Sequence, residues 1–252
     1  MQKNVEKMSL NYSPNFNSKK RSKSDIKYLI FHYTGMKSES GALKKLTNKN
    51  SGVSCHYLIK NNGKVIKVVP DLYVAWHAGI SSWKKDTFLN SKSIGVEISN
   101  PGHEHGYKKY NKKQVLSIIR LAKKLKEKYK IKKENILGHS DIAPLRKKDP
   151  GKHFPWHILC SKKISFFIYK KKTRDLNILK NWFYKNSIFT RKQICLFILA
   201  YVGYQISQIN DEKSMKKIIK SYQSHFLQNN VSGNIDQLTL DYMLNHLLNL
   251  VL

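Results

Sequence analysis

The chain has 252 residues, of which 40% are hydrophobic and 11% aromatic, and 47 Lys and Arg against 16 Asp and Glu give it a net charge of +31. This much apolar material excludes a collagen-like, low-complexity or wholly disordered chain. The three cysteines are widely spaced and odd in number, which excludes a disulfide scaffold and a zinc ribbon of paired cysteines. We therefore expect free, buried thiols.

The positive charge is uneven and consists mainly of lysine. Residues 1–172 hold 38 basic and 11 acidic side chains, a net charge of +27, whereas residues 173–252 hold 9 and 5, a net charge of +4. Only five of the 47 basic residues are Arg, the residue that nucleic-acid readers use for bidentate contacts. We favour compositional drift as the source of the charge, and a polycationic nucleic-acid-binding protein is the alternative. The contrast also predicts two parts with different chemistry.

Residues 1–25 are polar and basic and predict a solvated N-terminal arm. They lack the apolar centre of a signal peptide. The longest apolar stretch, residues 194–202, is about half of the ~20 residues that span a bilayer, so we expect no transmembrane segment. These features favour a cytoplasmic protein, or a periplasmic one if the N-terminus is incomplete.

Residues 26–172 predict an α/β domain. Residues 26–33, IKYLIFHY, are mostly apolar, aromatic and β-branched, which is typical of a buried strand. The elements that follow are a short helix over 40–50, a hairpin of 56–60 and 64–69 around Asn-Asn-Gly, a strand over 93–99, an amphipathic helix over 112–129, a short strand over 136–139 and a loop over 140–152. This order predicts a mixed central sheet flanked by helices.

Residues 173–252 predict a small C-terminal three-helix domain. Apolar residues recur at helical spacing over 192–201, 214–226 and 238–250, with no strand pattern between them. Asp236 precedes the last of these segments and is a good candidate for its N-cap.

Four residues stand out because their surroundings are unusual for their type. His32 and His139 each lie at the end of an apolar strand, and Glu97 is the one acid in the apolar run SIGVEIS. A buried carboxylate needs a cation, a metal or hydrogen-bond donors nearby. Asp149 precedes Pro-Gly and could be a simple turn residue, just as each histidine could be an ordinary half-buried one. His103 with His105, and His153 with His157, are weaker metal candidates.

Six segments resemble, in the same order, the zinc-dependent N-acetylmuramoyl-L-alanine amidases of the AmpD/AmiD type (amidase family 2). They are FHYTG (31–35), VSCHYLI (53–59), AWHAG (75–79), IGVEISNPG (94–102), GHSDIAP (138–144) and RKKDPGKHFPW (146–156). Residues ~190–250 resemble the three-helix peptidoglycan-binding domain of the two-domain members. The resemblance implies the amidase and peptidoglycan-recognition fold for residues 26–172, followed by a peptidoglycan-binding domain over 173–252.

The resemblance also implies a role for individual residues. His32, His139 and Asp149 match the ligands of one zinc ion per chain, and Glu97 and Lys147 match the two catalytic side chains. Trp76, His77 and Asn100 match positions that line the substrate groove, and Cys55 is a weak candidate for a fourth ligand. Two imidazoles and one carboxylate would leave an open fourth position on the metal, as in catalytic rather than structural zinc sites.

The implied reaction is hydrolysis of the amide between N-acetylmuramic acid, or its 1,6-anhydro form, and L-alanine of the stem peptide. Such a reaction belongs to peptidoglycan turnover or recycling, and whether intact wall or the anhydro muropeptide is preferred stays open. The expected partner is peptidoglycan or a muropeptide, with no specific nucleic acid, and we expect a monomer. A non-catalytic peptidoglycan recognition protein of the same fold is the alternative, and it would normally lack a zinc ligand.

Overall fold

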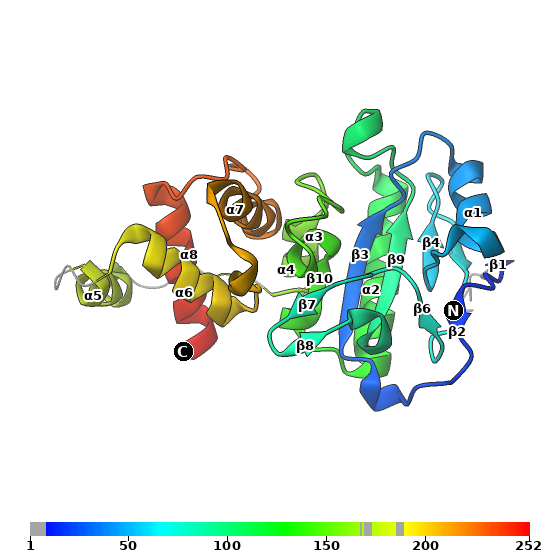
Figure 1. The fold of residues 1–252 in the computed structure, drawn as a ribbon, viewed down its shortest axis with the longest axis horizontal. Coiled ribbons are helices and arrows are strands. Elements are labelled where there is room, and N and C mark those ends of the chain that lie inside the picture. Colours follow the sequence, from blue (N-terminus) through cyan, green and yellow to red (C-terminus); the bar gives the residue numbers. More distant parts are fainter. Residues whose placement is uncertain (1–8, 167, 169–172, 185–188) are drawn as a thin grey trace, which may run out of the picture.

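A mixed sheet forms the centre of the larger part of the molecule in the computed structural model, which describes residues 9–166, 168, 173–184 and 189–252 (Figure 1). In these ranges the sheet has six strands in the order β1-β5-β4-β9-β3-β10. Their bounds are β1 Ser9–Leu10, β5 Val65–Lys67, β4 Tyr57–Ile59, β9 Ser93–Ile98, β3 Tyr28–Tyr33 and β10 Ile136–Gly138. The hairpin of β4 and β5 and the strands at β3, β9 and β10 confirm the predicted elements.

β3 lies in the middle of this sheet and pairs in parallel with both β9 and β10. Its residues are buried except for Tyr33, which is half-buried. A strand covered on both faces requires a nearly continuous apolar run, which explains the sequence of residues 28–31. His32 is the polar exception in this strand and is only 1% exposed.

Helices cover the sheet on both sides. α2, Lys112–Tyr129, packs Ile118, Ala122 and Leu125 against the sheet. Its first turn is closed by a capping box, in which Asn111 and Gln114 each accept a hydrogen bond from the backbone N–H of the other. α1, Glu39–Thr47, lies beside the hairpin of β4 and β5, while the short α3, His139–Ile142, and α4, Trp156–Ser161, follow β10.

The C-terminal part is helical, as predicted, but it contains an additional helix. Its helices are α5 Thr173–Tyr184, α6 Arg191–Val202, α7 Glu212–Phe226 and α8 Gln237–Val251. α5 lies outside the three predicted helices, although Leu176, Leu179 and Phe183 recur there at helical spacing. Asp236 caps α8 by accepting a hydrogen bond of 2.7 Å from the backbone N–H of Thr239, as predicted. None of the helices in the described ranges is long and apolar enough to cross a bilayer.

One apolar core joins the two parts. The cluster that contains Ile30 and Leu137 of the sheet also contains Ile198 of α6, Ile218 of α7 and Leu244 of α8. The backbone N–H of Lys84 donates to the carbonyl of Gly203 at 2.8 Å, which adds a main-chain link. The helical part is therefore packed on the sheet domain through buried residues of both.

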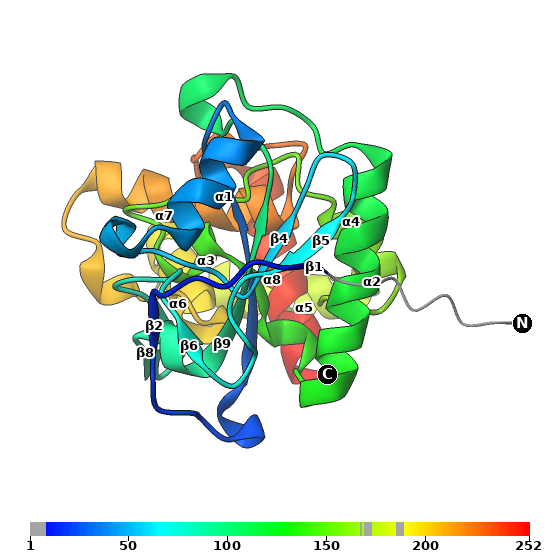
Figure 2. The ribbon, with the colours of Figure 1, turned by 90° about the vertical axis from the view of Figure 1, so that its right-hand side faces the viewer.

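The predicted N-terminal arm is largely exposed over residues 10–25, but it is paired with the sheets instead of being free, while residues 1–8 lie outside the described ranges. β1 extends the main sheet by pairing with β5, and β2, Phe16–Asn17, pairs with β6, Val74–Ala75 (Figure 2). Arg21 is 9% exposed and donates to the carbonyl of Asp71 at 2.9 Å. Strands of two residues are too short to show a hydrophobic period, so the composition of this segment predicted its exposure but not its pairing with the sheets.

Candidate active site

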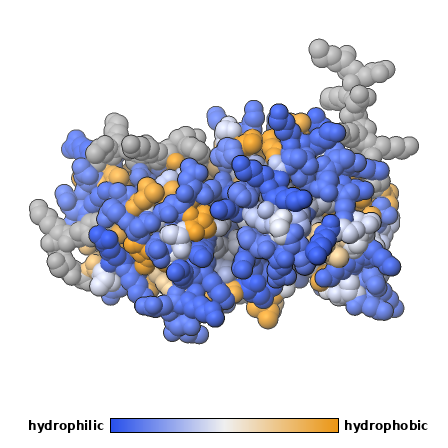
Figure 3. Space-filling model, turned by 90° about the horizontal axis from the view of Figure 1, so that it is seen from above, coloured by the Kyte–Doolittle hydropathy of each residue, from blue (hydrophilic) through white to orange (hydrophobic). Residues whose placement is uncertain are grey.

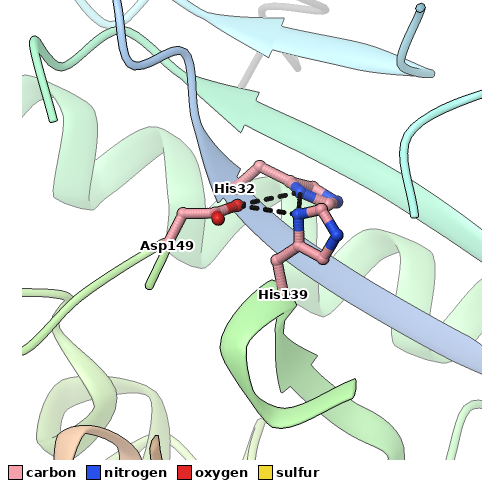
Figure 4. A group of neighbouring side chains, drawn as sticks. All are labelled: His32, His139 and Asp149. Atoms are coloured by element: carbon pink, nitrogen blue, oxygen red, sulfur yellow. Dashed lines mark hydrogen bonds and ion pairs between the residues drawn. The ribbon is translucent and has the colours of Figure 1, made fainter. Parts of the chain in front are cut away.

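His32, His139 and Asp149 come together at one edge of the sheet (Figure 4). His32 lies near the end of β3, and His139 follows directly on β10. Because β3 and β10 are parallel neighbours, their carboxyl ends meet at the same edge, where ligand sites of such sheets usually form. Asp149 reaches this edge from the loop after α3. All three residues are buried, with exposed fractions of 1%, 3% and 6%.

The three ligand-type atoms are in close mutual contact. His32 Nδ1 lies 2.9 Å from His139 Nδ1, and Asp149 Oδ2 lies 3.1 Å from the first and 3.0 Å from the second. Among the described residues, this is the one group of three or more His, Cys, Asp and Glu side chains with such a geometry. The pairs His103 with His105 and His153 with His157 therefore form no such group, and neither does Cys55.

Hydrogen bonds behind the site determine which nitrogen of each imidazole is free. His139 Nε2 lies 3.0 Å from the carbonyl of Ala78, and because a carbonyl only accepts, this nitrogen carries the proton. Its Nδ1 is then unprotonated, and the lone pair of this nitrogen points at Asp149. His32 also has its Nε2 protonated and its Nδ1 free, and the contacts that determine this involve His77 and Ser93.

His32 Nε2 contacts His77 Nδ1 at 3.0 Å, and His77 Nε2 contacts the hydroxyl of Ser93 at 3.1 Å. That hydroxyl donates to the carbonyl of Leu89 at 2.6 Å, so its oxygen accepts from His77 Nε2. His77 Nδ1 must then accept from His32 Nε2, which leaves His32 Nδ1 unprotonated. Three electron pairs therefore face one another within hydrogen-bond distance. Such an arrangement is repulsive unless a cation lies between them, so the donor set fits a metal ion.

The position of His77 differs from the one expected for a residue of the substrate groove. It is 9% exposed and lies behind His32. Gly95 of β9 makes room for its ring, because a Cβ at that position would lie 2.3 Å from the ring Cγ. This placement favours orientation of His32 over contact with substrate. Sequence reasoning missed Ser93, which no motif distinguished.

Glu97 lies beside the three ligand residues. It is the register partner of His32 on the neighbouring parallel strand, so the two side chains project from the same face of the sheet. Its Oε2 is buried and has no hydrogen-bond partner among the described residues. Burial, together with the charge of Asp149, raises the pKa of Glu97 to about 8, while the charge of Lys147 opposes the shift. A carboxyl group of this kind can exchange a proton near neutral pH.

The remaining predicted residues surround the site at different depths. The charge of Lys147 acts on both Glu97 and His32. Trp76 is 36% exposed, and its indole N–H donates to Asn17 at 2.7 Å, so it is not a core residue. Asn100 is 5% exposed, and it donates to the carbonyl of Lys108 and accepts from the N–H of Gly102, which fixes the loop between them.

A mixed sheet with two histidines and a carboxylate at one edge, next to a glutamate whose Oε2 is buried, is the arrangement of a metal-dependent hydrolase. Residues 22–152 match the family model of the N-acetylmuramoyl-L-alanine amidases, and the chain belongs to that family. It is thus an amidase that cleaves the bond between N-acetylmuramic acid and L-alanine. This confirms the activity that the six sequence segments predicted.

Individual relatives extend the similarity beyond that match. N-acetylmuramoyl-L-alanine amidase AmiD of Escherichia coli (strain K12) is 34% identical over 225 residues, which are 84% of this chain and 78% of that protein. The 1,6-anhydro-N-acetylmuramyl-L-alanine amidase AmpD of Haemophilus influenzae is 30% identical over 162 residues, 57% of this chain and 85% of that protein. A solved structure of E. coli AmiD with anhydro-N-acetylmuramic acid-L-Ala-D-gamma-Glu-L-Lys superimposes with a TM-score of 0.73 at 30% identity and covers 91% of each chain.

Proposed function

We propose that this amidase uses one zinc ion held by His32, His139 and Asp149, with Glu97 and Lys147 as its catalytic side chains. The observation that carries the proposal is the convergence of three lone-pair donors beside Glu97, whose buried Oε2 has no hydrogen-bond partner among the described residues. Two imidazoles and one carboxylate are a ligand set of catalytic zinc sites. When bound, zinc supplies a Lewis acid that lowers the pKa of water and polarises a carbonyl group.

Glu97 acts as the proton carrier of the reaction. Its raised pKa, about 8, comes from a site without a metal charge, and a cation at the neighbouring ligands would lower it towards neutrality. The carboxylate would accept the proton of the attacking water and later give it to the amine of L-alanine, which leaves as the C–N bond breaks. The register with His32 keeps this carboxyl group next to the ligands throughout.

Lys147 stabilises negative charge on the carbonyl oxygen of the lactyl group. Its charge already acts on Glu97 and His32, which shows that it lies within electrostatic reach of the site. A fixed ammonium group aimed at developing charge lowers the barrier of acyl transfer. Trp76 and Asn100 stay candidates for the substrate groove, the first as an exposed aromatic surface and the second through the loop that it holds.

The substrate class is a muropeptide whose sugar is N-acetylmuramic acid or its 1,6-anhydro form, released or degraded in peptidoglycan turnover or recycling. The ligand of the AmiD complex supports this, as does the name of AmpD. In a stem L-Ala-D-γ-Glu-L-Lys, linkage through the γ-carboxyl of glutamate leaves its α-carboxyl free, and the terminal lysine carries a second carboxylate. The helices of residues 173–252 would bind peptidoglycan. A monomer in solution and a cytoplasmic location stay predictions, which light scattering and cell fractionation would test respectively.

Metal removal and restoration test the proposal. Purified protein should contain about one zinc per chain, release L-Ala-D-γ-Glu-L-Lys from the anhydro muropeptide, lose turnover on chelation and regain it with added zinc. His32→Ala should lose both zinc and turnover, because two remaining ligands hold zinc weakly. His105→Ala, at an exposed histidine of the short 3-10 helix His103–His105, is the control and should retain both. Full turnover by verified metal-free protein would contradict the proposal.

A further inference from the structure

A cleft with a volume of about 560 Å³ lies between the loop that carries Lys147 and helix α7. One wall comes from the segment 140–152, which contains the neighbours of two metal ligands: Ser140 follows His139, and Lys148 precedes Asp149. The opposite wall comes from α7, with Lys217, Lys220 and Ser224. The cleft therefore begins next to the candidate metal site and continues along the helical part.

The lining of this cleft is cationic. Its basic side chains are Arg146, Lys147, Lys148, Lys152, Lys217 and Lys220. Among its described lining residues none is acidic, and no ion pair within the described ranges neutralises any of the six. Figure 3 views the molecule from above Figure 1 and shows a surface on this side that is mainly hydrophilic.

The lysine excess of the chain does not by itself account for the α7 wall. Residues 173–252 hold only nine basic residues, and two of them line this cleft. Lys217 is also held in place, since its Nζ donates to the carbonyl of Leu145 at 3.0 Å across the cleft. Some lysines of the described ranges pair with carboxylates, such as Lys128 with Asp71 at 2.7 Å, but none of these lines the cleft. What distinguishes the cleft is that five lysines and Arg146 line facing walls without an acidic residue among them.

We propose that this cleft is the subsite for the free α-carboxylate of D-γ-Glu in the stem peptide, with Lys217 and Lys220 of α7 as specificity-determining residues. The inference rests on the proposed function. A peptide leaving the metal site advances about 3.3–3.6 Å per residue, which places the α-carboxylate of D-γ-Glu on the order of 7 Å from the scissile amide. A carboxylate at that distance would enter the cleft, whose lining includes the sequence neighbours of His139 and Asp149, and charge pairing there would raise substrate affinity. The helical part would therefore contribute to recognition of the soluble muropeptide in addition to binding peptidoglycan.

The proposal is tested by comparing the steady-state kinetics of two proteins on two substrates. The full chain and its K217A/K220A variant are compared on the anhydro muropeptide with the D-Glu α-carboxyl free and on the same compound with that carboxyl amidated. With the free acid the variant should show KM about tenfold higher at a similar kcat, since two partly exposed ion pairs are lost. With the amide the difference should fall below about twofold. K123A/K124A, which removes two exposed charges from α2, is the matched control and should match the parent on both.

The results distinguish failure of the proposed subsite from failure of the proposed function. An equal loss on both substrates, or no loss on either, overturns the subsite, whereas failure of the parent chain to cleave either substrate overturns the proposed function. Calorimetric binding of the free tripeptide L-Ala-D-γ-Glu-L-Lys gives a readout independent of turnover, and the variant should bind it about tenfold more weakly. If the double variant does not fold, K220E serves instead, because Lys220 is exposed and its reversed charge should raise KM for the acid alone.

Discussion

His225 of α7 donates a hydrogen bond of 2.7 Å from Nδ1 to the carboxyl group of Asp141, two residues after the metal-ligand candidate His139. The same carboxyl group accepts from the hydroxyl of Tyr204 at 2.6 Å and from the backbone N–H of Gly138 at 2.7 Å. Asp141 is 1% exposed. The C-terminal helices therefore hold the short helix on which His139 lies, and they support the site through buried polar contacts as well as through the shared core.

Asp141→Asn should destabilise the chain by about 2–3 kcal/mol in urea unfolding. The asparagine amide keeps the shape of the side chain, but its NH2 group would face the donors that now bind Asp141. Buried hydrogen-bonding groups are then left unsatisfied. Zinc affinity should fall as well, because the turn that carries His139 loosens. Asp241→Asn is the control, since Asp241 forms a half-exposed pair with Lys180 at 2.8 Å and should lose less than about 1 kcal/mol. Equal effects of the two substitutions would contradict this account.

His77→Ala should weaken zinc binding by about 10–100-fold, the usual cost of losing a residue that orients a ligand. Without His77, His32 Nε2 loses its 3.0 Å contact, and the ring no longer has a fixed orientation. Competition with a chromophoric chelator measures the affinity directly. If His77 only contacts substrate, zinc affinity should stay at the level of the parent and KM alone should rise.

Glu97→Gln should lower kcat by at least ~10²-fold, the scale of general acid–base catalysis, because the amide retains the shape but cannot accept a proton. Zinc content should stay unchanged, since Glu97 is outside the ligand group. In the parent, the carboxyl group must be ionised to take the proton of water, so kcat/KM should rise as pH increases through its pKa, and this limb should disappear in the variant. Steady-state rates across pH, with metal analysis of each sample, check both statements.

Lys147→Ala should reduce kcat on the order of 10²-fold with little change in KM, as for a lost oxyanion donor. Lys148→Ala removes the same charge from the adjacent position and provides the comparison. It should affect mainly KM, and by only a few-fold. Near-parental rates for both variants would remove Lys147 from the mechanism.

Asp71 provides a test of stability against pH. Burial would raise the pKa of Asp71, but hydrogen bonds from Lys128, Tyr129, Tyr57 and Lys67 outweigh it and hold the pKa well below its usual range. A carboxylate with a lowered pKa stabilises the fold above the pKa of the unfolded chain, near 3.9, and this stabilisation is lost as pH falls further. Asp71→Asn should therefore cost about 2–3 kcal/mol at pH 7 and progressively less below about pH 4. A constant difference across this range would contradict the assignment.

The sequence alone determined those features that depend on local pattern. The apolar run at residues 28–33 is a central strand, and the spacing of Ile118, Ala122 and Leu125 placed α2 at Lys112–Tyr129. The ordered motifs identified His32, His139 and Asp149 as one group and indicated the family. Each of these signals is contained in a short segment, because hydrophobic period and motif residues are properties of neighbours along the chain.

The tertiary structure decided what depends on partners distant in sequence. His32 and Asp149 are 117 residues apart, and only the parallel pairing of β3 with β10 and the path of the following loop bring them to 3.1 Å. His77 is buried behind His32 because Gly95 leaves room for its ring, and Asp141 takes its partners from residues 63 and 84 positions later. A hydrogen bond between such side chains leaves no period in the sequence. It exists because folding buries both groups in one place, where each must find a partner.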